Sequence, residues 1–160
     1  MGRARIRAAL ATTAALAVVI PAVSIAGQAG EQAERVKVAT KLKGKNEVPG
    51  PGDPDGGGRI ALFLTAEKQR ACLELELEAV DSVVAARVHK GPAGEQGPSK
   101  LVLFKDQAGL DGDGSFNGCV KKVKKRLLKS IAANPQDYYV NLFTRSYPEG
   151  AVRGQLKARG

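Results

Sequence analysis

The sequence has few of the residues that most often carry chemistry or base stacking. Its 160 residues include no tryptophan, three tyrosines, four phenylalanines, two cysteines and one histidine, His89. Proteins that bind bare nucleic-acid strands need several aromatic side chains, so this scarcity argues against specific nucleic-acid binding. Zinc and copper sites usually take two or three imidazoles, so a single histidine argues against such a centre.

Signatures of common nucleophilic enzymes are also missing. The sequence contains no Gly-x-Ser-x-Gly motif, and His89 is the only imidazole available as a base. We therefore expect no catalytic residues, no metal ligands and no cofactor, and we interpret the protein as non-enzymatic. The alternative is a small secreted enzyme or metal-binding protein that uses the polar residues near His89.

Long apolar runs are absent except at the N-terminus. Residues 1–7 are short and basic, and residues 8–26 are apolar and end in the small-x-small sequence Ser24-Ile25-Ala26. This pattern predicts a signal peptide over residues 1–26 that is cleaved after Ala26. An uncleaved membrane anchor is the alternative, and Pro21 near the end of the run argues against it. We expect a secreted protein, extracellular or in the cell envelope.

The chain that remains after cleavage is basic and long enough for one domain. Residues 27–160 contain 22 basic and 16 acidic residues, which gives a net charge of +6 over 134 residues. We expect residues 27–34 to form a flexible stub and residues 35–158 to form a single β domain. An excess of positive charge favours an acidic partner, either an extracellular protein or a polymer of the cell envelope.

Alternation of apolar and polar residues runs through most of this domain. It predicts strands, separated by loops rich in glycine and proline, over residues 35–45, 59–65, 70–80, 83–89, 101–105, 119–121, 138–145 and 151–156. A helical spacing of apolar residues predicts one short helix over residues 123–133. The fold class is therefore all-β with one short helix, a Greek-key β-sandwich or barrel of about seven to nine mostly antiparallel strands.

Two predicted strands carry opposite charges on their polar faces. The strand over residues 35–45 alternates with lysines, and the strand over residues 70–80 alternates with glutamates. We expect these strands to be neighbours that form a ladder of ion pairs. The alternative is that the lysine stripe binds a polyanion.

The two last strands form a hairpin around the turn Tyr147-Pro148-Glu149-Gly150. Gly154 removes a side chain in the second strand, which indicates a bulge or a close backbone approach. We expect a core hairpin with a polar outer face. A sharper hypothesis places a candidate polar cluster on that face and on the neighbouring strand, formed by His89, Asn141, Arg153 and Gln155.

Cys72 and Cys119 are the only cysteines, an even number in a chain with an export signal. A disulfide between them is therefore expected. Cys72 shares the glutamate-bearing side of its strand, so the bond should fix the segment around Cys119 on the outer face or edge of the sheet.

The predicted helix is strongly basic on its outer side. We interpret this side as a solvated face, with the alternative of a docking patch for an acidic partner, formed by Lys121, Lys124, Lys125 and Lys129.

Three motifs together resemble one known family. Asn46-Glu47-Val48-Pro49, the segment Ala85–Gly91 followed by Pro92-Ala93-Gly94, and the segment Tyr139–Leu156 occur in the order and spacing of a CHRD domain. The resemblance covers residues 36–156 and implies an all-β extracellular domain. In chordin, this domain forms part of an antagonist of secreted growth factors, whereas stand-alone members have no biochemical activity that could be carried over.

The chain departs from the family pattern at two histidines. Arg87 stands where the fourth strand usually has its first histidine, and Phe143 replaces a histidine of the penultimate strand. Other polar residues of the pattern are kept, namely His89, Asn141, Thr144, Arg153 and Gln155. The resemblance therefore implies only part of the polar cluster of the family and weakens any metal-binding role for it.

Overall fold

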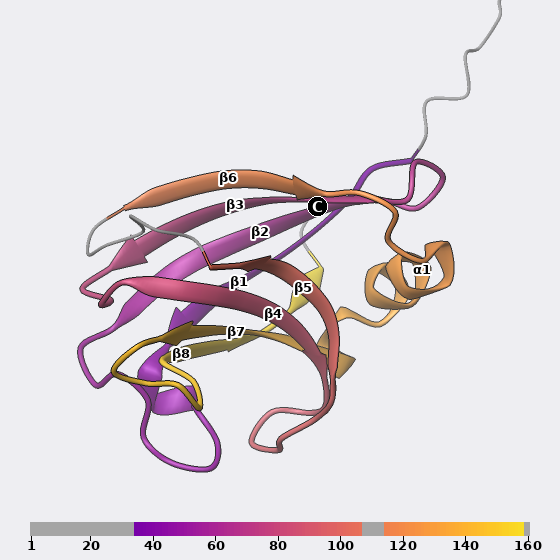
Figure 1. Cartoon of the computed structure of the whole chain (residues 1–160). Coiled ribbons are helices and arrows are strands. Elements are labelled where there is room, and N and C mark those ends of the chain that lie inside the picture. Colours follow the sequence, from indigo (N-terminus) through magenta and orange to yellow (C-terminus); the bar gives the residue numbers. More distant parts are fainter. Residues whose placement is uncertain (1–33, 107–113, 159–160) are drawn as a thin grey trace, which may run out of the picture. The chain divides into compact units, whose positions relative to one another are not determined.

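The computed structural model describes residues 34–106 and 114–158. The predicted signal peptide, residues 27–33 of the predicted stub and residues 107–113 lie outside the described residues. Within them, the chain forms one antiparallel sheet that curls into a nearly closed barrel (Figure 1). The expected all-β fold with one short helix is confirmed. No helix in the described part of the chain is long and apolar enough to cross a membrane.

The sheet contains nine strands in the order β5-β4-β7-β8-β1-β2-β3-β6, and β9 pairs with β1 outside this path. The strands are β1 (Val36–Lys43), β2 (Gly57–Thr65), β3 (Arg70–Glu78), β4 (Val83–Lys90), β5 (Ser99–Lys105), β6 (Ser115–Val120), β7 (Tyr138–Thr144), β8 (Val152–Gln155) and β9 (Lys157–Ala158). The strand β6 begins earlier than the short strand predicted from the sequence. The 3₁₀ turns η1 (Gly44–Asn46) and η2 (Pro135–Asp137) precede loop 47–56 and β7.

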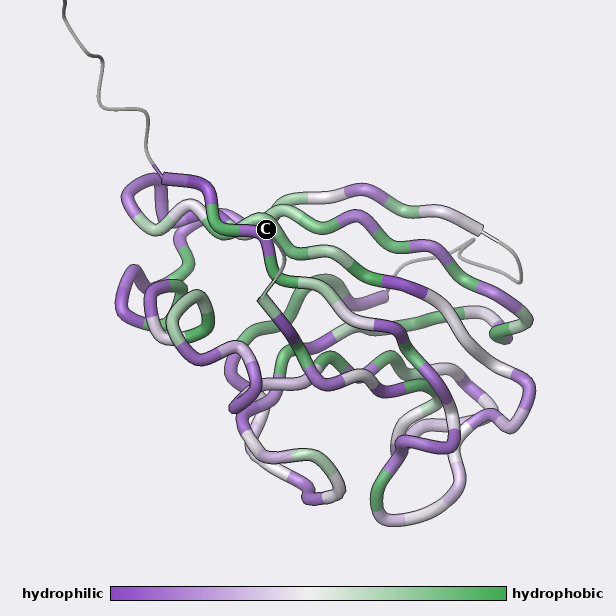
Figure 2. The backbone as a smooth tube through the Cα atoms, turned by 180° about the vertical axis from the view of Figure 1, so that it is seen from behind, coloured by the Kyte–Doolittle hydropathy of each residue, from purple (hydrophilic) through white to green (hydrophobic). Residues whose placement is uncertain are grey.

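Apolar residues of the alternating pattern are buried in the core of the barrel, and Figure 2 shows the alternation of apolar and polar residues along the strands. The helix α1 (Lys125–Ala133) covers one end of the barrel, and its Leu128 and Ile131 are buried in the core (Figure 1). Where the two outermost strands approach each other, the rings of Phe104 and Phe116 lie 5.0 Å apart. The core is therefore continuous and is enclosed by the sheet, the helix and this ring contact.

The prediction that the lysine strand and the glutamate strand are neighbours in the sheet is wrong. β2 lies between β1 and β3, so Lys41 pairs in register with Arg59, and Arg59 pairs with Glu76. The ion pair that forms is Arg59–Glu76, at 3.1 Å and with both side chains exposed. Such exposed pairs contribute roughly 0–1 kcal/mol, so charge pairing has little influence on the strand order.

The C-terminal hairpin has the predicted turn, and Gly150 N–H donates to Tyr147 O at 3.2 Å. A Cβ at Gly154 would collide with the backbone oxygen of Lys41, so this glycine allows the close approach of β8 to β1. The polar outer face expected for this hairpin is, however, buried. All seven residues of β7 are buried, because the loops 44–56 and 91–98 cover the side that faces away from the core.

Cys72 and Cys119 lie opposite each other on β3 and β6 and form the predicted disulfide. Cys72 is half-buried and Cys119 is exposed, on the side of β3 that also carries Glu74 and Glu76. The bond therefore fixes β6, an edge strand, to the rest of the sheet.

We predict that the double variant Cys72→Ser/Cys119→Ser folds but is less stable than the wild type. The bond joins residues 47 positions apart. Removing a loop constraint of that length costs about 4 kcal/mol in the chain-entropy treatment. Urea denaturation of the oxidised wild type and of the variant checks this, and equal midpoints would contradict it.

Candidate functional site

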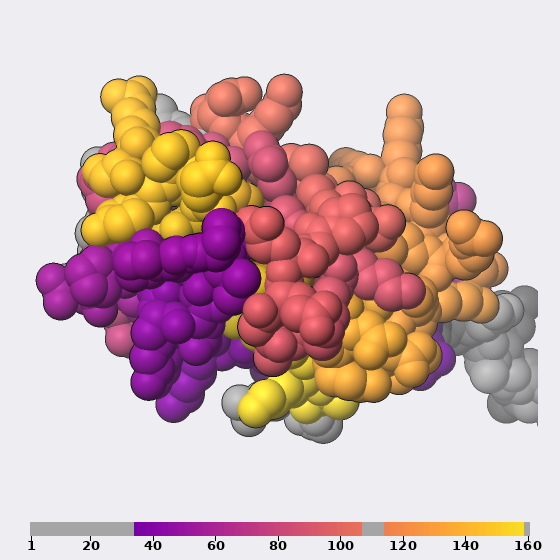
Figure 3. Space-filling view, turned by 90° about the horizontal axis from the view of Figure 1, so that it is seen from below, coloured from indigo at the N-terminus to yellow at the C-terminus, as the bar shows by residue number. Residues whose placement is uncertain are grey.

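The candidate polar cluster lies on the outer face of β4, β7 and β8. Arg87, Asn141 and Arg153 are paired in register across the three strands, and His89, Tyr139 and Gln155 form the next row. The four residues of the predicted cluster are thus brought onto one face. Loops 44–56, 91–98 and 145–150 approach this face from different parts of the sequence (Figure 3).

Arg153 lies at the β8 end of the row that it forms with Arg87 and Asn141, and it is only 3% exposed. Its Nη2 donates to Pro92 O at 3.0 Å and to Glu95 O at 2.8 Å, and its guanidinium lies 3.5 Å from the centre of the Tyr139 ring. Hydrogen bonds from a buried cation are stronger than those between neutral groups. Arg153 therefore holds loop 91–98 onto the sheet.

The neighbouring row binds the same loop. Gln155 Nε2 donates to Gly91 O at 2.8 Å and to Gln136 O at 2.6 Å. The Nδ1 atom of His89 lies 2.9 Å from Gly97 O, and Gly97 N–H donates to the Tyr139 hydroxyl at 3.0 Å. The loop that follows β4 is therefore fixed at several points and forms one wall of the face.

Glu47 belongs to the loop that covers this face and was not singled out as a site residue from the sequence. It is 9% exposed, and its Oε2 accepts a hydrogen bond from Asn141 Nδ2 at 3.2 Å. Burial raises its pKa from 4.5 to about 7, even though the positive charge of Arg153 and the Asn141 hydrogen bond oppose the shift. Gly150, which has a positive φ of 145°, makes room for this carboxylate, since a Cβ there would collide with Oε2.

His89 stacks on Tyr139 at 5.0 Å between ring centres, and Arg87 lies 4.8 Å from the centre of the Phe143 ring. Burial lowers the pKa of His89, and the charges of Arg87 and Arg153 lower it further, against the hydrogen bond with Gly97. Burial and the two guanidiniums therefore favour the neutral imidazole. In the described part of the chain, no three His, Cys, Asp or Glu side chains are grouped so that they could hold a metal ion.

A cleft of about 590 Å³ opens on this face; we name it the His89 cleft. Among the residues that line it are Arg87, His89, Tyr139, Asn141, Phe143 and Pro148. Arg153 and Gln155 belong to the predicted cluster but do not line the cleft, because both are turned to loop 91–98. Arg87 and Phe143 do line it; the sequence pointed to them only as departures from the family pattern.

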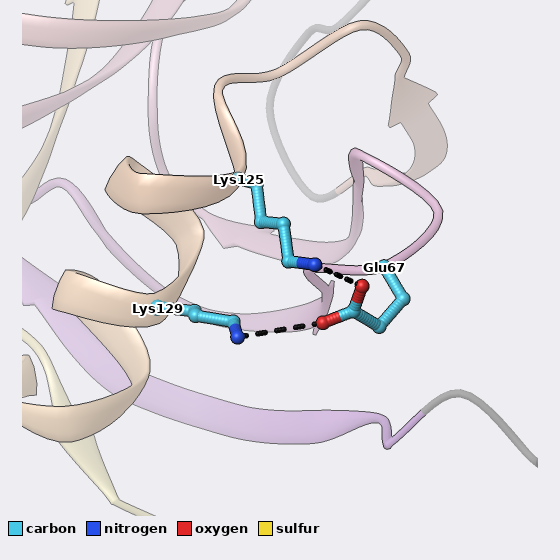
Figure 4. A network of polar contacts seen from close by, with 3 residues as sticks. All are labelled: Glu67, Lys125 and Lys129. Carbon is cyan, nitrogen blue, oxygen red and sulfur yellow. Dashed lines mark hydrogen bonds and ion pairs between the residues drawn. The ribbon is translucent and has the colours of Figure 1, made fainter.

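The predicted basic patch on the helix divides into two sides. Lys125 forms an ion pair with Glu67 in the turn between β2 and β3, and Lys129 lies 3.4 Å from the same carboxylate (Figure 4). These two lysines hold the pKa of Glu67 below its ordinary value. Lys125 and Lys129 are therefore partly neutralised, and they are four residues apart, which places them on the same side of a helix.

The other side of the helix borders a groove of about 540 Å³, which we name the α1 groove. Its lining includes Lys90, Lys100, Lys124, Arg126, Leu127 and Tyr138. Lys121 is exposed after the end of β6 and does not line the groove. The sequence did not indicate Lys90 and Lys100 as neighbours of Lys124 and Arg126, because these two lysines come from strands that are distant in sequence from the helix.

Together these features define a disulfide-linked antiparallel β domain with a buried polar face and a separate basic groove. The family model for the CHRD domain matches residues 38–156, and the chain belongs to this family. Neither the search of curated proteins nor the search of solved structures found a significant match.

We predict that Arg153→Met lowers the free energy of unfolding by about 3 kcal/mol, because it removes two charge-assisted hydrogen bonds that a buried guanidinium makes to loop 91–98. Arg87→Met is the matched control, since Arg87 lies in the same row of the sheet and has no hydrogen bond within the described residues that would be lost. Urea denaturation compares the two. Equal costs for both variants would contradict the central role of Arg153.

We also predict that the stability difference between Glu47→Gln and the wild type depends on pH. The raised pKa means that folding favours the protonated carboxyl, so its stabilisation is complete below about pH 4.5 and is lost as the pH rises through about 7. The variant should therefore gain on the wild type between about pH 4.5 and about pH 7, by up to about 3 kcal/mol. Denaturation curves at several pH values check this, and a constant difference would refute it.

Proposed function

We propose that this CHRD domain is an exported, non-catalytic binding module that engages an acidic polymer of the extracellular space or cell envelope through the α1 groove. The N-terminal sequence pattern supports export, and the disulfide supports an oxidising compartment. The observation that carries the binding role is the set of four cations around one groove, none of which forms an ion pair with an acidic group within residues 34–106 and 114–158.

The charge and the shape of the α1 groove support the proposal that it binds an extended acidic ligand. Lys90 and Lys100 come from the sheet, whereas Lys124 and Arg126 come from the start of α1, so positive charges line both sides. Between them, Leu127 is half-buried and Tyr138 is buried, which gives an apolar floor along which lysine and arginine stems can lie. A polymer with repeated negative charges can contact both sides at the same time.

The ion pairs of the helix support the groove side of α1 as the binding surface. The lysines that Glu67 neutralises lie on the opposite side, towards the turn between β2 and β3 (Figure 4). Their charge is already used within the domain, so they offer less attraction to a polyanion than the cations of the groove. The docking patch suggested from the sequence is accordingly replaced by the α1 groove.

Two double variants test this proposal. Lys124→Gln/Arg126→Gln removes two charges from the groove, and Lys125→Gln/Lys129→Gln removes the same number from the opposite side of the helix. With immobilised poly-L-glutamate as the probe, the wild type and the second variant should bind saturably, and the first variant should bind at least tenfold more weakly.

Binding through this groove should also weaken with salt, because the screening length falls from about 10 Å at 0.1 M to about 3 Å at 1 M. Immobilised dextran serves as the uncharged control polymer. Equal loss in both double variants would show that net charge alone governs binding, and that result, like an absence of binding by the wild type, would overturn the proposal.

A further inference from the structure

The outer face of the sheet from β1 to β3 carries a stripe of positive charges beside a stripe of negative charges. We name this surface the charged face. Its exposed charged residues are Lys37, Lys41 and Lys43 on β1, Arg59 on β2, and Glu74, Glu76 and Glu78 on β3. The chain as a whole is strongly basic, yet acids and bases are almost balanced on this face. The charged face is therefore close to neutral but is polarised across its strands.

The two stripes cannot neutralise each other within one chain. β2 separates them, so that Lys41, Arg59 and Glu76 form one row. Neighbouring strands lie about 4.8 Å apart, which places the lysine and glutamate backbones about 10 Å apart. Arg59 pairs with Glu76, but the other charged residues of this face form no ion pair within residues 34–106 and 114–158. Both stripes therefore keep charge that is available to a partner.

A groove of about 580 Å³ lies between the stripes. Lysines of β1 line one side of it and glutamates of β3 line the other, and its floor contains the short side chains of Ala39 and Ala61, which are both half-buried. A second surface can therefore approach the backbone closely at the centre of the charged face, while long charged side chains reach past it on both sides.

A partner with charge of only one sign fits this face poorly. A polyanion on the lysine stripe would lie about 10 Å from the glutamate stripe, which is no more than one screening length at 0.1 M salt, and would be repelled by it. A partner that carries both signs at the same spacing meets attraction on both stripes. A second copy of this chain has that spacing by construction.

The order of the stripes selects one arrangement of two copies. Turning one copy by 180° about an axis parallel to β2 brings the two outer faces together, exchanges the stripes and preserves the rows. Lys41 of each copy then faces Glu76 of the other, and Lys43 faces Glu78. An axis across the strands would instead set lysines against lysines.

We propose that the charged face joins two copies of this chain in a symmetric dimer, with the lysine stripe of each copy against the glutamate stripe of the other. The strands of the two facing sheets run within about 30° of each other, as in β-sandwiches. The two Arg59 side chains meet near the axis, and each is kept beside Glu76 of its own chain by the existing ion pair. The dimer does not involve the α1 groove and does not depend on the function proposed for it.

This dimer is weak because the available area is small. From their lengths and the usual strand spacing, β1, β2, β3 and β6 together present roughly 500 Å² per copy. That area lies at the lower limit of specific protein interfaces. Opposite charges, more than apolar burial, give the contact its specificity, so the association depends on protein concentration and on salt.

Sedimentation velocity of the purified protein measures the association. At about 0.1 M salt, the wild type should form a dimer whose fraction rises with protein concentration up to the millimolar range. At about 1 M salt, where the screening length is about 3 Å, it should be a monomer.

Two charge-reversal variants locate the interface. Lys41→Glu/Lys43→Glu and Glu76→Lys/Glu78→Lys should each dimerise at least tenfold more weakly than the wild type, because each sets like charges opposite each other. An equal mixture of the two variants should dimerise at least as strongly as the wild type, since every facing pair then has opposite charges. Far-UV circular dichroism shows that each variant is folded.

Lys68→Glu/Lys121→Glu is the matched control for net charge. It reverses two exposed lysines outside the charged face, so it should dimerise as the wild type does.

A zero-length cross-link tests the orientation of the two copies. An equal mixture of ¹⁴N- and ¹⁵N-labelled wild type is treated with a carbodiimide, which joins an amine to a carboxylate only where the two are in contact. Mass spectrometry should find peptide pairs of mixed isotope that join Lys41 to Glu76 or Lys43 to Glu78.

Several results would overturn the assignment. These are a monomer at every concentration in low salt, dimerisation that neither reversal weakens, equal weakening by the control variant, a mixture of the two reversed variants that stays monomeric, or the absence of both cross-links. Capture of poly-L-glutamate by Lys41 and Lys43 of a monomeric protein would also overturn it, and would identify a polyanion as the partner of this face. Loss of polyglutamate binding at the α1 groove, with dimerisation retained, would remove only the function proposed for that groove.

Discussion

The guanidinium of Arg153 is the group on which the organisation of the polar face depends. It is buried on β8, and it donates to two carbonyls of loop 91–98 while it covers the Tyr139 ring. The loop is thereby drawn over the sheet, and its Gly97 reaches His89 and Tyr139. β7 would otherwise have one solvent-exposed face, but it is covered on both sides. The side chains on its outer face are therefore removed from solvent as a group.

That loss of water explains the electrostatics of the face. The carboxyl of Glu47 holds its proton up to about pH 7, and the imidazole of His89 loses its proton more readily than in water. Both shifts have the same first cause, which is burial of the charged form. The guanidinium of Arg153 lowers both pKa values, so it opposes the effect of burial at Glu47 and adds to the effect of burial at His89.

The sequence was sufficient for most of the strands and for the disulfide, because alternation reports which side chains share a face and two cysteines have one possible pairing. It was not sufficient for the order of the strands. Lysines on β1 and glutamates on β3 suggested that these strands are neighbours, yet β2 lies between them. In this position β2 buries Ile60 and Leu62 in the core, and that burial outweighs the pairing of exposed charges. Likewise, Asn141 and Arg153 follow the pattern of a solvated face but are covered by loops whose paths no local pattern encodes.

On the helix, the four-residue spacing of Lys125 and Lys129 could have indicated that they share a side. Their common acid, Glu67, comes from a turn that is distant in sequence, so its position could not be predicted.

The ring contact between Phe104 and Phe116 has a mechanical consequence for the domain. β5 and β6 are the two ends of the strand order, and side chains join them where backbone ladders join the other neighbours in that order. Separating β5 from β6 breaks ring and apolar contacts but no ladder of backbone hydrogen bonds. These two strands are therefore the easiest pair in the barrel to separate. The covalent link between β3 and β6 lies on one side of this contact. When the ring contact parts, β6 stays joined to β3 by the disulfide and a backbone ladder, whereas β5 stays joined to β4 by a ladder alone.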